Sequence, residues 1–273
     1  EWNRTRELLA EAREFSTTAQ HAMSVLQVET YLESRLGRIE RAIELTEEHL
    51  TFARQVQSPV EQVFGYNFPM IQFKVLLGRL DEAESLLLNA QQAVQPPMNQ
   101  FLAFSEVMVF ARKGDIERAS TALESARSVI EHFQADYLAF MLSLSAAEIA
   151  NATGDYTAAG EHYKDAIAEA NRSVFAAGLQ EEQSIIYAAC ADAHIKAGEL
   201  DLAQSVLDYA FKRDSAEPDL WVARAMLQEA TGAPHMALAS VNYALAIWAE
   251  ADPDYVHFQE ALDLKQRLQA SSR

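Results

Sequence analysis

The chain has little cysteine, glycine and proline. Its 273 residues include one cysteine, nine glycines and seven prolines. A single cysteine forms no internal disulfide, which favours a reducing, cytoplasmic compartment. A many-stranded β protein needs more glycine and proline than this for its turns. We therefore expect long helices joined by short connections. Polar residues also interrupt every apolar stretch before the about 18 residues that span a bilayer, which argues against a membrane protein.

Basic residues are also scarce. Lys and Arg number 22 against 40 Asp and Glu, which gives a net charge of −18. Such a chain repels phosphate backbones and anionic lipids, so we expect no direct nucleic-acid binding and no membrane binding. Because 49% of the residues are hydrophobic, the chain is expected to fold. The first residues, Glu1-Trp2-Asn3-Arg4, contain neither an initiator Met nor a leader sequence, so we interpret the chain as part of a longer protein.

Six of the nine glycines begin the same phrase, in which Gly is followed by any four residues and then Ala. The phrases span Gly37–Ala42, Gly78–Ala83, Gly114–Ala119, Gly154–Ala159, Gly198–Ala203 and Gly232–Ala237. Successive glycines are separated by 41, 36, 40, 44 and 34 residues. A recurrence in this range is typical of a repeat architecture.

The phrase has a physical interpretation as a helix-to-helix corner. Gly ends one helix in the left-handed conformation, and a polar residue just after it caps the next helix. The Ala lies where the two antiparallel helices approach most closely. The predicted helices are 2–14, 17–36, 39–56, 59–77, 80–94, 97–113, 116–133, 136–153, 156–171, 176–197, 200–213, 217–231, 234–250 and 254–271. Within 59–77, we expect Pro69 to kink or break the helix.

These corners resemble the tetratricopeptide repeat (TPR), which has a large apolar residue four positions after the Ala and a second Ala three further on. Here those pairs are Leu87 and Ala90, Leu123 and Ala126, Tyr163 and Ala166, Leu207 and Ala210, and Val241 and Ala244. The longer repeats are also similar to the superhelical domains of bacterial transcriptional activators of the maltose-activator type. The resemblance implies one all-α, right-handed superhelical solenoid of antiparallel helix pairs over 1–273. It would comprise a partial leading helix (1–16), about six repeats (17–250) and a C-terminal capping helix (254–271).

No motif indicates catalysis, a cofactor or a metal. The glycines Gly154 and Gly160 are followed by Glu161-His162, which would repel a phosphate. No His is spaced from another His or Cys as a metal site on one helix requires. Cys190 falls on the inward face of a predicted helix, where a thiol behaves as a small hydrophobe. We therefore expect a protein that is not an enzyme and has no cofactor.

The resemblance places exposed positions of a concave groove ten and six residues before each corner Gly. Residues 134–210 contain twelve acids and three bases, so that the C-terminal half of this groove would attract a basic or amphipathic protein or peptide. The candidate groove residues, including neighbouring apolar positions, are Phe68, Gln72, Phe101, Phe104, Met108, Met141, Leu144, Glu148 and Asp192. The plainer alternative is that the apolar ones pack repeat against repeat.

The sequence thus predicts a non-catalytic protein–protein interaction and regulatory module. We expect it to be a sensor or scaffold segment of a larger bacterial signalling or transcription-regulatory protein. The alternative is a small-molecule (inducer) receptor, in which Phe101, Phe104, Met108 and Met141 enclose an apolar ligand. The oligomeric state stays open.

Overall fold

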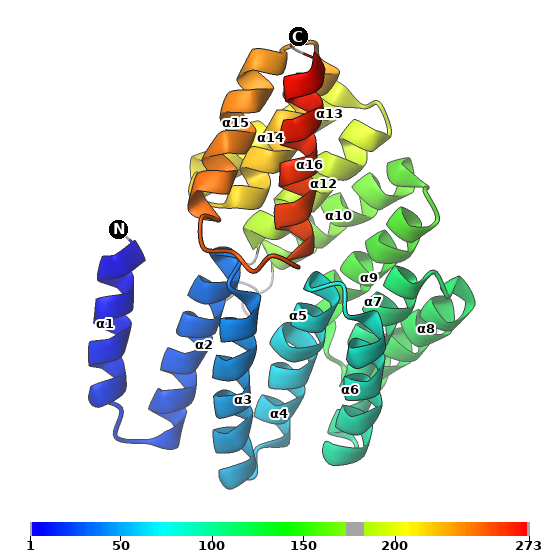
Figure 1. Ribbon diagram of the computed structural model, residues 1–273. Helices are drawn as coiled ribbons and strands as arrows, with labels where there is room; N and C mark the ends of the chain where they lie inside the picture. The colour runs from blue at the N-terminus through cyan, green and yellow to red at the C-terminus, as the bar shows by residue number, and fades with distance from the viewer. Residues whose placement is uncertain (1, 173–182, 272–273) are drawn as a thin grey trace.

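The computed structural model describes residues 2–172 and 183–271, and every regular element within these ranges is helical (Figure 1). In chain order the elements are α1 (Trp2–Glu14), α2 (Ala19–Arg35), α3 (Ile39–Gln55), α4 (Pro59–Gly65), the π-helical turn η1 (Tyr66–Met70), α5 (Ile71–Leu76), α6 (Leu80–Ala93), the 3₁₀ turn η2 (Met98–Leu102), α7 (Ala103–Lys113), α8 (Ile116–Phe133), the 3₁₀ turn η3 (Asp136–Leu138), α9 (Ala139–Ala152), α10 (Tyr156–Ala170), α12 (Gln183–Lys196), α13 (Leu200–Arg213), α14 (Pro218–Ala230), α15 (Pro234–Ile247) and α16 (Val256–Ser271). Successive helices pair antiparallel and stack into a right-handed superhelix, which confirms the predicted fold class.

The predicted corners form at all six phrases. Each corner Gly has a positive φ, between 69° and 79°. Each partner Ala is fully buried at 0% exposure, where the two helices of a pair are in closest contact. Two corners carry the predicted local cap, because Asp115 accepts from the backbone N–H of Arg118 and Asp155 accepts from that of Ala158. The left-handed backbone at the Gly and the buried packing at the Ala therefore define each repeat.

The break expected at Pro69 is present as the π-helical turn η1 between α4 and α5. Proline lacks the N–H that a regular α-helical turn needs, and the wider turn accommodates it. The buried Asn67 donates to the carbonyl oxygen of Phe101 at 2.8 Å and accepts from the Ser105 hydroxyl at 2.6 Å. These bonds attach η1 to η2 and to the start of α7.

Some predicted helix boundaries were wrong. The segments predicted as uniform helices over 97–113 and 136–153 each begin with a 3₁₀ turn. The last helix starts at Val256 rather than at 254, and Asp254 pairs with Arg79, which lies between α5 and α6. The predicted helix 176–197 is described from Gln183 onward, and its first residues lie outside the described ranges. In the part of the chain that the structure describes, no helix is long and apolar enough to span a bilayer.

The C-terminal repeat closes back onto the N-terminal one, which the sequence did not predict. Figure 1 shows the connection between α15 and α16 running across the ends of α2 and α3. The Trp248 indole N–H donates to the carbonyl oxygen of Arg35 at 3.0 Å, and the Asp252 N–H donates to that of Gly37 at 2.9 Å. One hydrophobic core cluster accordingly contains both Ile39 and Trp248. The solenoid is therefore closed into a ring.

Candidate functional site: a cavity inside the superhelix

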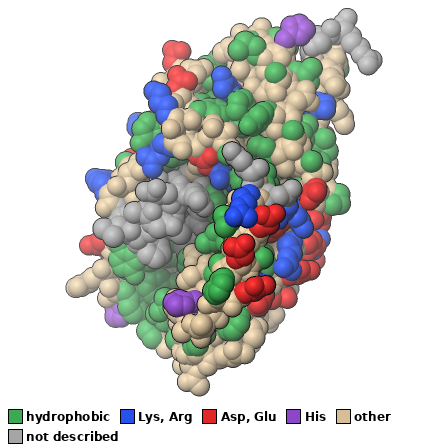
Figure 2. Space-filling view, turned by 90° about the vertical axis from the view of Figure 1, so that its left-hand side faces the viewer, with side chains coloured by type: hydrophobic (Ala, Val, Ile, Leu, Met, Phe, Trp, Pro, Cys, Tyr) green, Lys and Arg blue, Asp and Glu red, His purple; other side chains and the backbone are tan. Residues whose placement is uncertain are grey.

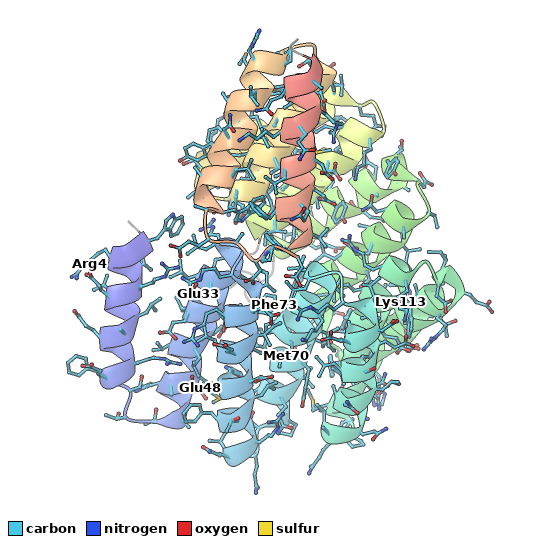
Figure 3. All side chains as sticks on the ribbon, viewed as in Figure 1. Arg4, Glu33, Glu48, Met70, Phe73 and Lys113 are labelled. Carbon is cyan, nitrogen blue, oxygen red and sulfur yellow. The ribbon has the colours of Figure 1, made fainter. Side chains whose placement is uncertain are left out.

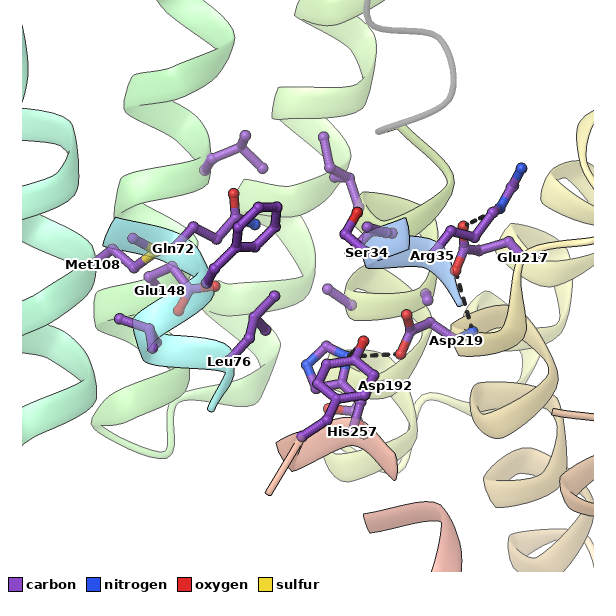
Figure 4. A pocket seen from close by; sticks show the side chains of 18 of the residues that line it. Ser34, Arg35, Gln72, Leu76, Met108, Glu148, Asp192, Glu217, Asp219 and His257 are labelled. Carbon is purple, nitrogen blue, oxygen red and sulfur yellow. Dashed lines mark hydrogen bonds and ion pairs between the residues drawn. The ribbon is translucent and has the colours of Figure 1, made fainter. Parts of the chain in front are cut away.

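A cavity of about 580 Å³ lies inside the ring and is called the central cavity below (Figure 4). Its lining comes mainly from the first helices of successive pairs, α2, α5, α7, α9, α12 and α14, together with α16. In a solenoid these helices form the concave surface. The ring closure adds α16 and turns an open groove into a cavity.

Much of the lining is apolar. The apolar side chains are Phe64, Phe73, Val75, Leu76, Met108, Phe140, Leu144, Ile185, Ile186, Val222 and Met226. They extend from the N-terminal half of the solenoid to the C-terminal half. A cavity with such walls and a few charged groups has the composition of ligand-binding pockets in general.

One charged group in the cavity is centred on Glu148 of α9. Its carboxylate accepts from the Arg112 guanidinium at 2.9 Å and from the Tyr163 hydroxyl at 2.9 Å. The nearby Glu148 carboxylate raises the pKa of Arg112, and burial, with the same carboxylate, raises the pKa of Tyr163 well above its usual value. Arg112 therefore stays cationic and Tyr163 neutral, and both orient Glu148.

Asp192 of α12 provides an unused acceptor beside this group. Its Oδ2 atom pairs with the Lys196 ammonium at 2.6 Å. Its Oδ1 atom is buried and has no hydrogen-bond partner among the described residues. A buried carboxylate oxygen without a partner is costly, and a donor supplied by a ligand would remove that cost.

A second charged group surrounds Arg35 at the end of α2. Its guanidinium pairs with Asp214 and, at 3.0 Å, with the fully buried Glu217. Burial raises the pKa of Glu217 to about 8, the neighbouring Asp219 adds to the rise, and Arg35 opposes it. Figure 4 shows Arg35 and Glu217 facing each other across the ring closure.

Next to it, His257 of α16 bonds to Asp219 of α14. The distance from Nδ1 to the Asp219 carboxylate is 2.7 Å, and the Tyr255 hydroxyl lies 3.3 Å from the same nitrogen. Burial lowers the pKa of His257, but the attraction and hydrogen bond of Asp219 outweigh it and raise the pKa to about 9. At neutral pH, His257 is therefore an imidazolium held by Asp219.

The cavity lining carries charged groups of both signs. Its lining includes six carboxyl groups (Glu148, Asp192, Glu217, Asp219, Glu260 and Asp263), four Arg or Lys side chains (Arg35, Arg112, Lys196 and Arg267) and the His257 imidazolium. Because the pKa of Glu217 is raised to about 8, five carboxylates and five cations are charged at neutral pH. Glu260 and Asp263, both on α16, form no ion pair with any described residue. These two carboxylates, which no described base approaches to ion-pair distance, favour a ligand that carries a cation.

Five of the residues predicted from the sequence line the central cavity. The five are Gln72, Met108, Leu144, Glu148 and Asp192. The side chain of Phe68 lies outside the described residues.

Phe101, Phe104 and Met141 lie in the hydrophobic core, with 8%, 6% and 7% exposure. The ring of Phe101 packs against Phe133, with the centroids 5.3 Å apart. The turns η1 and η2 both contact α7, the helix that carries Phe104. These three side chains therefore pack repeat against repeat instead of enclosing a ligand, unlike Met108, the fourth member of the predicted apolar stripe.

Sequence reasoning missed Arg35, Glu217, Asp219 and His257. They come from the two ends of the solenoid, and nothing in the repeat pattern predicts that these ends meet. The sequence did contain one signal for this site, the two acids of Glu217-Pro218-Asp219. Because these acids lie at a predicted helix start, they are ordinarily interpreted as helix caps.

The structure adds two observations on chemistry. Among the described residues, no three His, Cys, Asp or Glu side chains converge as metal ligands would. Cys190 is fully buried, and burial raises the pKa of its thiol to about 12, so that the thiolate is not formed at neutral pH.

Comparison with known proteins gives the fold. No family model matches the chain, and no curated protein matches it. A tetratricopeptide repeat protein from Parabacteroides merdae ATCC 43184 is 15% identical with a TM-score of 0.55, over 97% of this chain and 92% of that one. A signal transduction ATPase (STAND protein) with a tetratricopeptide repeat sensor from Pyrococcus horikoshii is 13% identical with a TM-score of 0.62, over 97% and 42%. The Cut9-Hcn1 hetero-tetramer of APC/C is 18% identical with a TM-score of 0.57, over 98% and 46%. The chain therefore has the fold of tetratricopeptide-repeat proteins.

Proposed function

We propose that the chain is a non-catalytic interaction and regulatory module that binds a basic or amphipathic peptide or protein segment in its central cavity. The observation that carries the proposal is the combination, in one cavity, of apolar walls with carboxylates that form no ion pair with a described residue or keep an unused oxygen. An amphipathic segment would bury its apolar side chains against Leu144 and Met108 and present its cations to the acids.

Charge supports a basic partner. The Oδ1 atom of Asp192 lacks a donor, and Glu260 and Asp263 form no ion pair with a described residue. An ammonium or guanidinium group would satisfy these carboxylates with charge-assisted hydrogen bonds. The net charge of −18 would also steer such a segment toward the protein, with an association rate that falls as salt rises.

The structural neighbours support a role within a larger protein. The protein from Pyrococcus horikoshii is described as an ATPase whose repeats form its sensor, and Cut9-Hcn1 is an assembly of several chains. We propose that this chain is likewise a sensor or scaffold segment of a larger cytoplasmic signalling or transcription-regulatory protein of bacteria, of the maltose-activator type.

Selection from a random peptide library on the purified chain tests the proposal. We expect selected peptides to be enriched in Lys or Arg next to apolar residues, and Leu144→Glu and Glu148→Lys to weaken their binding at least tenfold in calorimetry. The matched controls are Leu88→Glu and Glu124→Lys, which make the same changes at exposed positions outside the cavity. Equal loss in the controls, or selected peptides that are acidic, would contradict cavity binding.

The cavity volume favours a second candidate, a small-molecule receptor. About 580 Å³ lies within the roughly 300–1,000 Å³ of small-molecule sites. Dansylcadaverine, which joins an apolar fluorophore to a primary ammonium, is a suitable probe. Binding of this dye that is sensitive to Leu144→Glu, with no peptide selected from the library, would favour the receptor over the peptide-binding module.

A further inference from the structure

The contacts that close the ring between the two ends of the solenoid are called the latch below. Its N-terminal side is Arg35, Gly37 and Glu40, and its C-terminal side is Trp248 and Asp252. The carboxylate of Asp252 accepts from the backbone N–H of Glu40 at 2.8 Å. Arg38, at the N-cap position of α3, makes no side-chain cap bond, so α3 is capped by a residue more than 200 positions away.

The latch is held by one buried aromatic side chain, by the pairs of Arg35 with Asp214 and Glu217, and by partly exposed ion pairs. Trp248 is its one large, fully buried apolar side chain. Around it, Arg79 pairs with Asp254 at 2.7 Å and Arg38 pairs with Glu250 at 3.5 Å, and these partly exposed pairs are screened by water and salt. Within each repeat, by contrast, two whole helices pack along their length. In a solenoid, the contacts between neighbouring repeats supply the stability, so the superhelix remains folded when the latch is open.

The latch is continuous with the central cavity. Arg35 lines the cavity and also holds Asp214 and Glu217 of the C-terminal half. Directly after the latch, Tyr255 and His257 line the same cavity. A ligand in the cavity would therefore touch residues on both sides of the latch, while Gly37, Trp248 and Asp252 lie outside the lining.

We infer that the latch opens to admit ligand to the central cavity and that bound ligand holds it closed. This inference rests on the proposed ligand binding in the cavity. A ligand that contacts both sides favours the closed ring over the open one by its extra contacts, so that binding changes the curvature of the whole superhelix. That change is the signal a sensor segment would pass to the rest of a larger protein.

Distance measurements test the opening itself. In a Cys190→Ala background, spin labels at Glu47→Cys on α3 and Gln266→Cys on α16 report the separation of the two sides by double electron–electron resonance. We expect one short distance in the parent chain and a second, longer population of at least a tenth of the molecules when Asp252→Ala is added. Asp115→Ala removes an equivalent cap from α8, away from the latch, and should leave the distance unchanged. An unaltered distribution in Asp252→Ala overturns the latch.

Dye uptake tests the gating. The substitutions Arg38→Cys and Glu250→Cys, joined by a short bismaleimide, lock the latch from the solvent side. We expect locking to slow the association of dansylcadaverine at least tenfold and Asp252→Ala to accelerate it. Binding at the same rate in the locked and unlocked chains overturns the gating while leaving the proposed cavity binding intact. Absence of dye binding in every chain overturns both the gating and the cavity site.

Discussion

The six corner glycines share a backbone conformation but differ in their surroundings. All have positive φ, which costs an L-residue roughly 1–2 kcal/mol. A Cβ added to Gly198 would meet no atom within 4 Å. One added to Gly37 would lie 2.6 Å from the Cβ of Ala251 and 3.1 Å from the Trp248 ring. Gly37 therefore serves both the corner and the ring closure.

Replacing each of these two glycines by alanine separates the two roles. Gly198→Ala should lower the free energy of unfolding by about 1–2 kcal/mol, since only the left-handed backbone is strained. Gly37→Ala should lower it by a further ~1–2 kcal/mol, because the closure contacts must shift. Urea titrations followed by circular dichroism measure both values. Equal losses in the two variants would show that the closure contributes nothing to stability.

Among the elements, α1 is attached in a different way from the others. Its contacts with α2 and α3 include the ion pairs of Arg6 with Glu33 at 3.0 Å, and of Arg13 with Glu29 at 3.0 Å and Glu48 at 2.6 Å. Figure 3 shows Glu33 on α2, which faces α1, and Glu48 on α3, and Figure 2 shows acidic and basic side chains interleaved on one face. The apolar side chain of Phe15, just after α1, is 79% exposed. Electrostatics therefore contributes more to the position of α1 than to that of the core helices.

Salt should loosen α1 selectively. Exposed and partly exposed ion pairs are worth about 0.2–1 kcal/mol each and are screened by salt. We expect the amides of α1 to exchange hydrogen about tenfold faster in 0.5 M than in 0.05 M NaCl. The amides of α7, whose Val107 and Phe110 are buried, serve as the internal control and should not change. Mass spectrometry of the exchanged peptides measures both, and a parallel increase in α7 would refute selective loosening.

At the scale of the whole molecule, the closure makes the two ends of the solenoid interdependent, and it places unusual titrating groups in one cavity. The pKa of His257 is raised to about 9 and that of Glu217 to about 8. Both folded values lie above the ordinary ones of 6.5 and 4.5, so each group binds its proton more tightly in the folded protein. Stability from these groups is present at low pH and is lost as the pH rises through the folded values.

The free energy of unfolding should therefore fall as the pH rises from 6.5 to 9. The shift of His257 contributes at most about 3 kcal/mol to this fall, and Glu217 adds to it below pH 8. Asp219→Asn removes the attraction that raises the pKa of His257 and the repulsion that adds to the burial effect on Glu217, so it should flatten the dependence. Asp201→Asn, at an exposed position on α13, is the matched control and should retain the parent slope. Urea unfolding at pH 6, 7, 8 and 9 provides the test, and an unchanged slope in Asp219→Asn would disprove the assignment.

The sequence by itself determined the helix pairs, the six corners and the break at Pro69, because each follows from local backbone chemistry. Glycine alone tolerates the left-handed corner, alanine alone fits the closest approach, and proline cannot continue an α-helix. The sequence also placed Glu148, Asp192 and Leu144 on the concave side, because equivalent positions of successive repeats occupy equivalent places in a solenoid.

Only the tertiary structure decided that the groove becomes a partly enclosed cavity. Closure depends on the accumulated curvature of all the repeats, and small differences in repeat length and in turns such as η1 sum along the solenoid. That sum brings Asp252 to the start of α3 and His257 and Glu217 to the same cavity as Arg35. For the same reason Phe101, Phe104 and Met141 lie in the core, because the 3₁₀ and π turns around them change the packing that a uniform helical period predicts.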